Sequence, residues 1–151
     1  PVIANYKASL AQVVESYLQR FSPDENHPFL QRLTSAMSGQ FTFSGSWSVK
    51  LKPLGFHVNH VHPEGWISSA SYISLPDTMS DQASQSGCIK FGESALMLGE
   101  REVVERVIHP AAGQLVLFPS YTWHGTYAFE GDTADFRLTA PFDVVPAREQ
   151  K

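Results

Sequence analysis

Three of the six histidines of the chain fall within six positions, at 57, 60 and 62. His60 and His62 are two residues apart, so on an extended strand both side chains would leave from the same face. Imidazole is a common ligand of transition metals, and two imidazoles on one face provide half of a metal site. We therefore expect a strand over residues 56–62 that presents two metal ligands. On that strand His57 has the opposite parity, which predicts a neighbouring or substrate-side position.

A third ligand must come from elsewhere, because two ligands on one strand make a weak, open site. His124 is the best candidate, since it follows an apolar run and a Pro-Ser corner and so begins a strand. His27 and His109 each precede a proline, which favours capping or surface positions. Glu64 shares the parity of His62 and offers an alternative carboxylate, but the adjacent proline and turn disfavour it.

Arg137 interrupts an otherwise apolar and β-branched segment at residues 135–143. If its side chain faces inward, the guanidinium needs a buried anion, because an unpaired buried charge is very costly. If it faces solvent, an ion pair with Asp135 or Glu130 is sufficient. The pattern alone leaves both orientations open.

The composition limits the class of protein. The chain has 151 residues, 42% of them hydrophobic and 17% charged, which predicts one globular domain with its own core. A formal net charge of −4 without a basic stripe argues against nucleic acid. No apolar run approaches the roughly 20 residues of a membrane span, and no secretory signal opens the chain. The single cysteine, Cys88, excludes an intrachain disulfide and is compatible with a cytoplasmic protein.

The first 40 residues are predicted to be helical. Apolar residues between Tyr6 and Phe21 recur every three to four positions, which is the period of a helix packed on one side. Turn formers at residues 22–26 end this pattern. A second, shorter helix is expected from about Pro28 towards Gly39. Both helices are predicted to pack on the outside of a sheet.

From residue 41 onward, short β-type runs alternate with Gly, Pro, Ser and Asp. Regular short strands without intervening helices predict an antiparallel sandwich or barrel. The expected strands are 41–44, 46–52, 56–62, 67–75, 87–91, 102–108, 114–118 with 122–127, and 135–143. The polar stretch 77–86 is expected to be a mobile loop near a pocket mouth.

The order of these motifs resembles the iron(II)- and 2-oxoglutarate-dependent oxygenases, whose core is a double-stranded β-helix (a cupin-like jelly roll). The matching features are His-x-His, Tyr72 on the next strand, Gly-x-Ile-x-Phe at 87–91, Gly-x-Leu-x-Leu-Phe-Pro-Ser before His124, then Arg137 and Phe142-Asp143. The resemblance covers about residues 46–146 and is closest to a bacterial subfamily whose domain often ends a longer chain with tetratricopeptide repeats. We therefore expect residues 1–151 to form one domain, with a helical part at 1–40, a β-helix core at 41–146 and further sequence before it.

The resemblance implies roles for six residues. His60 and His124 match the two metal-binding histidines, whereas His62 stands where the widespread pattern has Asp or Glu. This implies a three-histidine Fe²⁺ site. Arg137 matches a basic residue that pairs with the 5-carboxylate of 2-oxoglutarate. Tyr72 matches a tyrosine that donates to the same carboxylate, and His57 matches a position that lines the cosubstrate pocket.

The implied activity is that of an Fe(II)/2-oxoglutarate dioxygenase of the hydroxylase type. Such an enzyme uses O₂ to couple decarboxylation of 2-oxoglutarate to oxidation of a small molecule or a protein side chain. With His62 in place of a carboxylate, the centre with bound 2-oxoglutarate is neutral, instead of having one net negative charge. The alternative is a non-catalytic or 2-oxoglutarate-independent three-histidine metal-binding jelly roll. Arg137 separates the two, because only cosubstrate binding explains an inward arginine. Association into a homodimer through edge strands is compatible with either.

Overall fold

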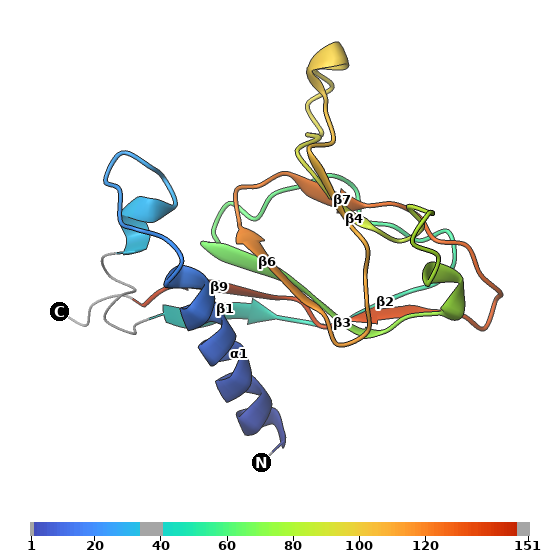
Figure 1. Cartoon of the computed structure of the whole chain (residues 1–151), viewed down its shortest axis with the longest axis horizontal. Coiled ribbons are helices and arrows are strands. Elements are labelled where there is room, and N and C mark those ends of the chain that lie inside the picture. The colour runs from blue at the N-terminus through green and yellow to red at the C-terminus, as the bar shows by residue number, and fades with distance from the viewer. Residues whose placement is uncertain (1, 34–40, 148–151) are drawn as a thin grey trace.

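The computed structural model describes residues 2–33 and 41–147, which form one long helix and two antiparallel β-sheets (Figure 1). The helix is α1 (Val2–Leu18), and three short 3₁₀ turns are η1 (Leu30–Arg32), η2 (Asp77–Met79) and η3 (Gly99–Arg101). The strands are β1 (Phe41–Ser46), β2 (Val49–Leu51), β3 (Ile67–Ser74), β4 (Ile89–Phe91), β5 (Arg106–Ile108), β6 (Leu115–Pro119), β7 (His124–Thr126), β8 (Arg137–Thr139) and β9 (Phe142–Pro146). Within the described residues, none of the helices has the length and apolar character needed to cross a membrane.

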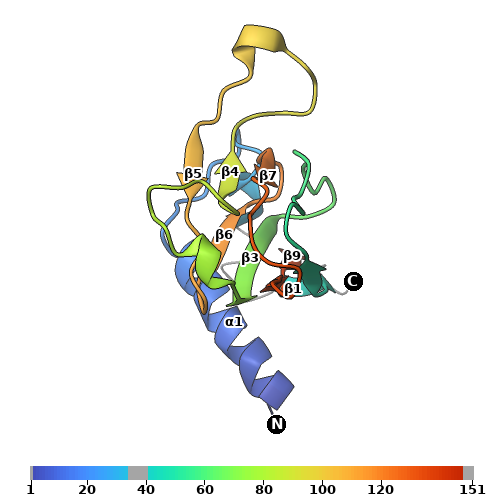
Figure 2. The ribbon, with the colours of Figure 1, turned by 90° about the vertical axis from the view of Figure 1, so that its right-hand side faces the viewer.

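Strand β3 is the centre of the larger sheet. That sheet has the order β1-β9-β3-β8-β2, and β6 pairs with the other side of β3. The smaller sheet has the order β5-β4-β7 and lies over the larger one (Figure 2). All of these pairings are antiparallel. Two facing antiparallel sheets with a helix outside confirm the predicted mainly β jelly roll.

Helix α1 is held by an apolar core on the outer face of the larger sheet. Val14 and Leu18 are buried on the helix face whose apolar residues recur at helical spacing. They belong to one cluster with Ile67 of β3 and with Phe142 and Val144 of β9. A second cluster fills the space between the sheets and consists of Tyr72, Ile89, Phe91, Val116 and Phe118. The pocket described below lies beside this second cluster.

The prediction of a second helix is largely wrong within the described residues. Only the single 3₁₀ turn Leu30–Arg32 forms, and residues 34–40 lie outside the described part of the chain. His27, for which a capping or surface position was expected, accepts hydrogen bonds through Nδ1 from the backbone N–H groups of Phe29 and Leu30 at 3.2 and 3.3 Å, just before this turn. The stretch 77–86 is a loop as expected, with one 3₁₀ turn at its start.

The single strand predicted over residues 135–143 is two strands, β8 and β9. Pro141 lies between them, and a proline has no N–H to donate to a β-ladder. The break separates the pairings, because β8 pairs with β2 and β3 whereas β9 pairs with β1 and β3. The consequence for the site is that Arg137 and Asp143 approach the pocket from different places.

Candidate functional site

The strand predicted over residues 56–62 does not form. Backbone hydrogen bonds still join this segment to β7, between Thr126 N–H and the His57 carbonyl (3.0 Å) and reciprocally between His60 and His124 (2.9 and 3.0 Å). Two residues, 58 and 59, therefore lie between the bonded positions on one side, whereas only Gly125 lies between them on the other. One extra residue on one side is the geometry of a β-bulge, which reverses the alternation of side chains.

Because of the bulge, the orientation of the His57 side chain differs from the one expected on an unbroken strand. Because the parity changes between His57 and His60, both imidazoles line one pocket, with ring centroids 6.4 Å apart. His57 is thus a pocket residue, because the unbroken strand that was expected to turn it away is absent. Its backbone N–H is held by Thr126 Oγ1 at 2.9 Å.

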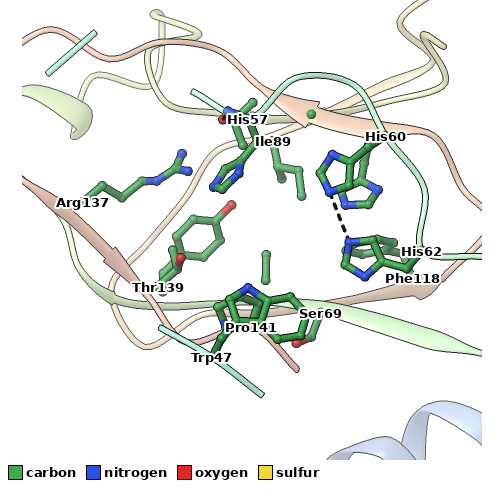
Figure 3. A pocket seen from close by; sticks show the side chains of 15 residues that line it. Trp47, His57, His60, His62, Ser69, Ile89, Phe118, Arg137, Thr139 and Pro141 are labelled. Carbon is green, nitrogen blue, oxygen red and sulfur yellow. Dashed lines mark hydrogen bonds between the residues drawn. The ribbon is translucent and has the colours of Figure 1, made fainter. Parts of the chain in front are cut away.

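The imidazoles of His60, His62 and His124 converge at one end of this pocket (Figure 3 shows His60 facing His62). Their candidate ligand nitrogens all lie within 4.8 Å of one another. The Nε2 atoms of His60 and His62 are 3.1 Å apart. The His124 ring packs between those of His60 and Phe118, with centroid distances of 4.3 and 4.6 Å. The chain thus brings together the three histidines that the sequence singled out.

Each of the three rings is oriented through its Nδ1 atom. His60 Nδ1 lies 2.7 Å from the Val58 carbonyl, and His124 Nδ1 lies 3.0 Å from the Thr122 carbonyl. His62 Nδ1 lies 2.9 and 2.7 Å from the two carboxylate oxygens of Asp143. Because these acceptors require a proton on Nδ1, the Nε2 atoms present their lone pairs to the pocket. This is the usual outer arrangement around metal-binding histidines.

Burial keeps two of the pocket histidines neutral. Desolvation lowers the pKa of His124 to about 4, although its bond to the Thr122 carbonyl acts in the opposite direction. Desolvation also lowers the pKa of His57 to about 4, with further lowering by the positive charge of Arg137 and by His60. Since a metal competes with protons for imidazole, neutrality at His124 favours coordination near neutral pH.

The other end of the pocket holds a buried cation. Arg137 of β8 is 2% exposed and points towards the pocket (Figure 3). Its guanidinium donates to the Gly87 carbonyl at 3.2 Å, while its Nε has no partner among the described residues. Burial lowers the pKa of Arg137, opposed by the nearby Tyr72 hydroxyl. Because Arg137 is buried, the solvent-facing alternative, with an ion pair to Asp135 or Glu130, is wrong.

Tyr72 adds a second unpaired donor to the Arg137 end. Its side chain is 1% exposed, and its hydroxyl has no hydrogen-bond partner among the described residues. Burial raises the pKa of Tyr72 to about 12, against a lowering by Arg137, so the hydroxyl keeps its proton. Among the described residues that line the pocket, none is acidic. A guanidinium and a phenol without an anion are an arrangement suited to binding a carboxylate.

Residues 45–143 match the model of a protein family described as "Putative 2OG-Fe(II) oxygenase". The chain belongs to this family. No curated protein matches it. The match covers both ends of the pocket, from Trp47 to Pro141, and extends to Asp143.

One solved structure supports the same fold for this oxygenase domain, and two others resemble it more weakly. An oxidoreductase of the 2OG-Fe(II) oxygenase family from Burkholderia pseudomallei aligns with a TM-score of 0.53 and 12% identity, covering 83% of this chain and 57% of that one. A prolyl-4-hydroxylase from Pseudomonas putida aligns with a TM-score of 0.49 and 18% identity, covering 89% and 65%. HygX from Streptomyces hygroscopicus, with nickel and 2-oxoglutarate bound, aligns with a TM-score of 0.47 and 12% identity, covering 90% and 76%. The oxygenase domain thus spans less than two thirds of the first two chains.

The residues of this oxygenase domain fit the metal and the cosubstrate that the family name implies. Two imidazole nitrogens bound at right angles to one metal, each at about 2.1 Å, lie about 3.0 Å apart. The observed Nε2 separation of 3.1 Å between His60 and His62 agrees with this. The orphaned Nε of Arg137 and hydroxyl of Tyr72 fit the carboxylate of a dicarboxylic acid. One end of the pocket therefore has nitrogen atoms that fit a metal, and the other end has hydrogen-bond donors that fit a carboxylate.

Sequence reasoning assigned no role to Asp143, although the residue was part of the family resemblance. Its place beside Phe142 in an apolar segment was the available signal, because a buried acid needs a partner. Glu64, the alternative carboxylate, is exposed and does not line the pocket. His109 is half-buried and lies 3.3 Å from Cys88 Sγ through its Nδ1, so its expected surface position is only partly right.

Proposed function

We propose that this chain is the catalytic domain of an Fe(II)/2-oxoglutarate-dependent dioxygenase of the hydroxylase type. In this proposal His60, His62 and His124 hold Fe²⁺ through their Nε2 atoms. Arg137 and Tyr72 bind the carboxylate of 2-oxoglutarate that is distant from the metal. Residues 41–146 form the catalytic core.

The observation that supports this most strongly is the polarity of one pocket. Three imidazole nitrogens lie at one end, and a buried guanidinium without a carboxylate partner lies at the other. Burial of the Arg137 charge is costly unless an anion binds beside it in the pocket. A ligand with one carboxylate for Arg137 and further oxygen donors for a metal satisfies both ends at once. 2-Oxoglutarate has this chemistry.

The chain's own residues give the bound acid its direction. Arg137 presents planar N–H groups that suit a bidentate carboxylate contact, and Tyr72 donates one further hydrogen bond. Because the pKa of Tyr72 is about 12, its hydroxyl stays a donor over the physiological range. His57 is neutral near pH 7, so it can line the same space without repelling Arg137 strongly.

The apolar walls of the pocket keep water from the metal end. Phe118 packs on His124, and Ile89 also lines the cavity. Trp47 also lines the pocket and is 42% exposed, and its ring centroid lies 6.0 Å from that of His62. We therefore place the entry of the substrate beside Trp47. The bound iron and 2-oxoglutarate would supply oxidative decarboxylation coupled to oxidation of a substrate C–H bond by O₂.

Turnover of 2-oxoglutarate tests the proposal. The purified domain with Fe(II), ascorbate and O₂ is expected to release succinate from 2-oxoglutarate at a slow rate without substrate, and a screen of amino acids, small metabolites and peptides should find one that accelerates it. His124→Ala is expected to release none, and Arg137→Met is expected to release succinate only at a far higher 2-oxoglutarate concentration. Metal binding without succinate release under all of these conditions would favour the 2-oxoglutarate-independent three-histidine protein instead.

A further inference from the structure

The three histidines of the proposed metal centre differ in what holds them. His60 and His124 each use Nδ1 to contact a backbone carbonyl two residues earlier in their own segments, Val58 and Thr122. These acceptors are local and uncharged. His62 instead contacts the carboxylate of Asp143, which is 81 residues away in the sequence, with both oxygens within 2.9 Å of Nδ1. One imidazole of the three therefore has a full negative charge behind it.

Asp143 is fixed in this position by the larger sheet. On β9 it pairs with Ser68 of β3, and on the other side it pairs with Gly45 of β1. Ser68 is fully buried, and its hydroxyl lies 3.2 Å from His62 Nδ1 and 2.8 Å from the hydroxyl of Ser120. Cross-strand partners thus meet the same nitrogen atom. This precision is more than a surface ion pair requires.

The carboxylate is also shielded from water. The side chains of His62 and Asp143 are 18% and 16% exposed. The Trp47 ring lies next to His62. In such surroundings the charge of Asp143 acts strongly on the imidazole that it contacts. None of the pocket-lining residues in the described ranges is acidic. Asp143 is the carboxylate that contacts a pocket histidine, His62.

We propose that Asp143 is the charge-supplying positioning residue of the metal centre, acting through His62 in place of a carboxylate bound directly to the metal. Non-haem iron oxygenases commonly use two histidines and one carboxylate as ligands. In this chain the carboxylate lies one hydrogen bond further out, and the imidazole between them transmits its effect by becoming a stronger electron donor. The inference rests on the proposed function only in taking His62 as a metal ligand.

Metal affinity of the apo-protein measures this directly, without cosubstrate or turnover. Titration with Co(II) alone, under anaerobic conditions and followed by Trp fluorescence and visible absorption, gives Kd for the parent and for Asp143→Asn. Loss of an outer carboxylate partner typically weakens metal binding by about 10–100-fold, which is the loss expected here. Asp143→Glu, which keeps the charge, is expected to recover part of it. Glu64→Gln removes a nearby exposed charge without touching the site and should leave Kd unchanged.

A second background separates charge supply from simple packing. In His62→Asp the carboxylate moves into the ligand position, and Asp143 becomes a second negative charge beside it. There Asp143→Asn is expected to leave Co(II) affinity unchanged or to raise it, opposite to its effect in the parent. Ser68→Ala removes a neutral contact to the same Nδ1. In the parent it should therefore weaken Co(II) binding less than Asp143→Asn does. The apo forms are compared by thermal unfolding, so that only folded variants enter the cycle.

Equal losses for Asp143→Asn in both backgrounds, or equal losses for Ser68→Ala and Asp143→Asn, would overturn the charge-supplying role while leaving a three-histidine metal centre in place. Failure of the folded parent to bind Co(II) at all would overturn the metal centre and the inference together. Binding by the parent with the expected reversal between backgrounds supports both.

Discussion

His60 and His124 exchange two backbone hydrogen bonds, of 2.9 and 3.0 Å, across an isolated bridge outside the regular strands. The bridge joins the segment that holds His60 and His62 to the start of β7, so the separation of the three imidazoles is set by main-chain contacts. The proposed ligand set is consequently assembled by main-chain contacts, without a metal. Such preorganisation reduces the conformational cost of coordination.

Gly125 is the residue on which this bridge depends most closely. A Cβ atom at position 125 would meet the side chain of Asn59 and the carbonyl of His57 at 3.0 Å. Gly125→Ala is therefore expected to displace the 57–60 segment, to lower the free energy of unfolding by about 1–3 kcal/mol, and to weaken Co(II) binding. Denaturant titration and Co(II) titration measure the two effects. Gly131→Ala, where the added methyl meets only the flexible side chain of Asp135, is the matched control and should leave Co(II) affinity intact.

Arg137→Met separates binding from stability. It removes a buried charge that has no anionic partner, so the apo-protein is expected to unfold at an unchanged or higher temperature. The same change should weaken 2-oxoglutarate binding by about 3 kcal/mol, or roughly 100-fold, because the ligand carboxylate loses its cation. Calorimetry and anaerobic ligand titration provide the two readouts. Unchanged 2-oxoglutarate affinity would assign Arg137 a structural role, and Arg20→Met controls for loss of an exposed arginine.

Tyr72→Phe removes a buried hydroxyl that has no partner in the apo-protein. Stability of the apo form should therefore stay the same or rise, since no hydrogen bond is lost. A hydrogen bond to a charged group contributes about 1.5–3 kcal/mol, so 2-oxoglutarate affinity should fall by roughly 10–100-fold. If affinity is retained, Tyr72 does not donate to the cosubstrate. Differential scanning fluorimetry with and without 2-oxoglutarate reports both quantities in one experiment.

The stability of the apo-protein is expected to decrease as the pH falls from 6.5 towards 4. In the folded protein the pKa values of His57 and His124 are lowered to about 4, whereas in the unfolded chain they return to 6.5. In this window the unfolded state binds more protons, so acidification favours unfolding, and above pH 6.5 this contribution is fully present. For the more deeply buried His124 the loss amounts to about 3 kcal/mol.

Urea titrations between pH 7 and 4 measure this slope. His57→Gln should flatten it, since one of the two groups no longer titrates. A parent whose stability does not change across this window would contradict the buried, neutral state of the two pocket histidines.

The sequence predicted the composition of the site better than its local structure. Apolar alternation and turn residues located most strands, because each strand has one face against a core. The bulge between His57 and His60 could not be predicted in this way, since it depends on pairing with a strand more than 60 residues away. His60 and His62 nevertheless face the same end of the pocket, as the parity argument predicted, because both lie beyond the bulge.

Asp143 was missed for a related reason. Its function is defined by contact with His62 across 81 residues of sequence, and no local spacing encodes that contact. The orientation of Arg137 was likewise undecided from the pattern, because an arginine in an apolar strand is compatible with either face. The break at Pro141 and the register of β8 against β2 turn it inward. Long-range pairing therefore determines what local periodicity leaves open.

Simultaneous binding of metal and 2-oxoglutarate is the most direct test of the proposed function. Anaerobic addition of 2-oxoglutarate to the Fe(II)-loaded protein is expected to produce a visible metal-to-ligand charge-transfer band that saturates with one equivalent of the acid. The band should be absent with succinate in place of 2-oxoglutarate, and in Arg137→Met it should require a far higher concentration. If a folded, Fe(II)-loaded protein develops no such band at saturating 2-oxoglutarate, 2-oxoglutarate is not the cosubstrate of this centre.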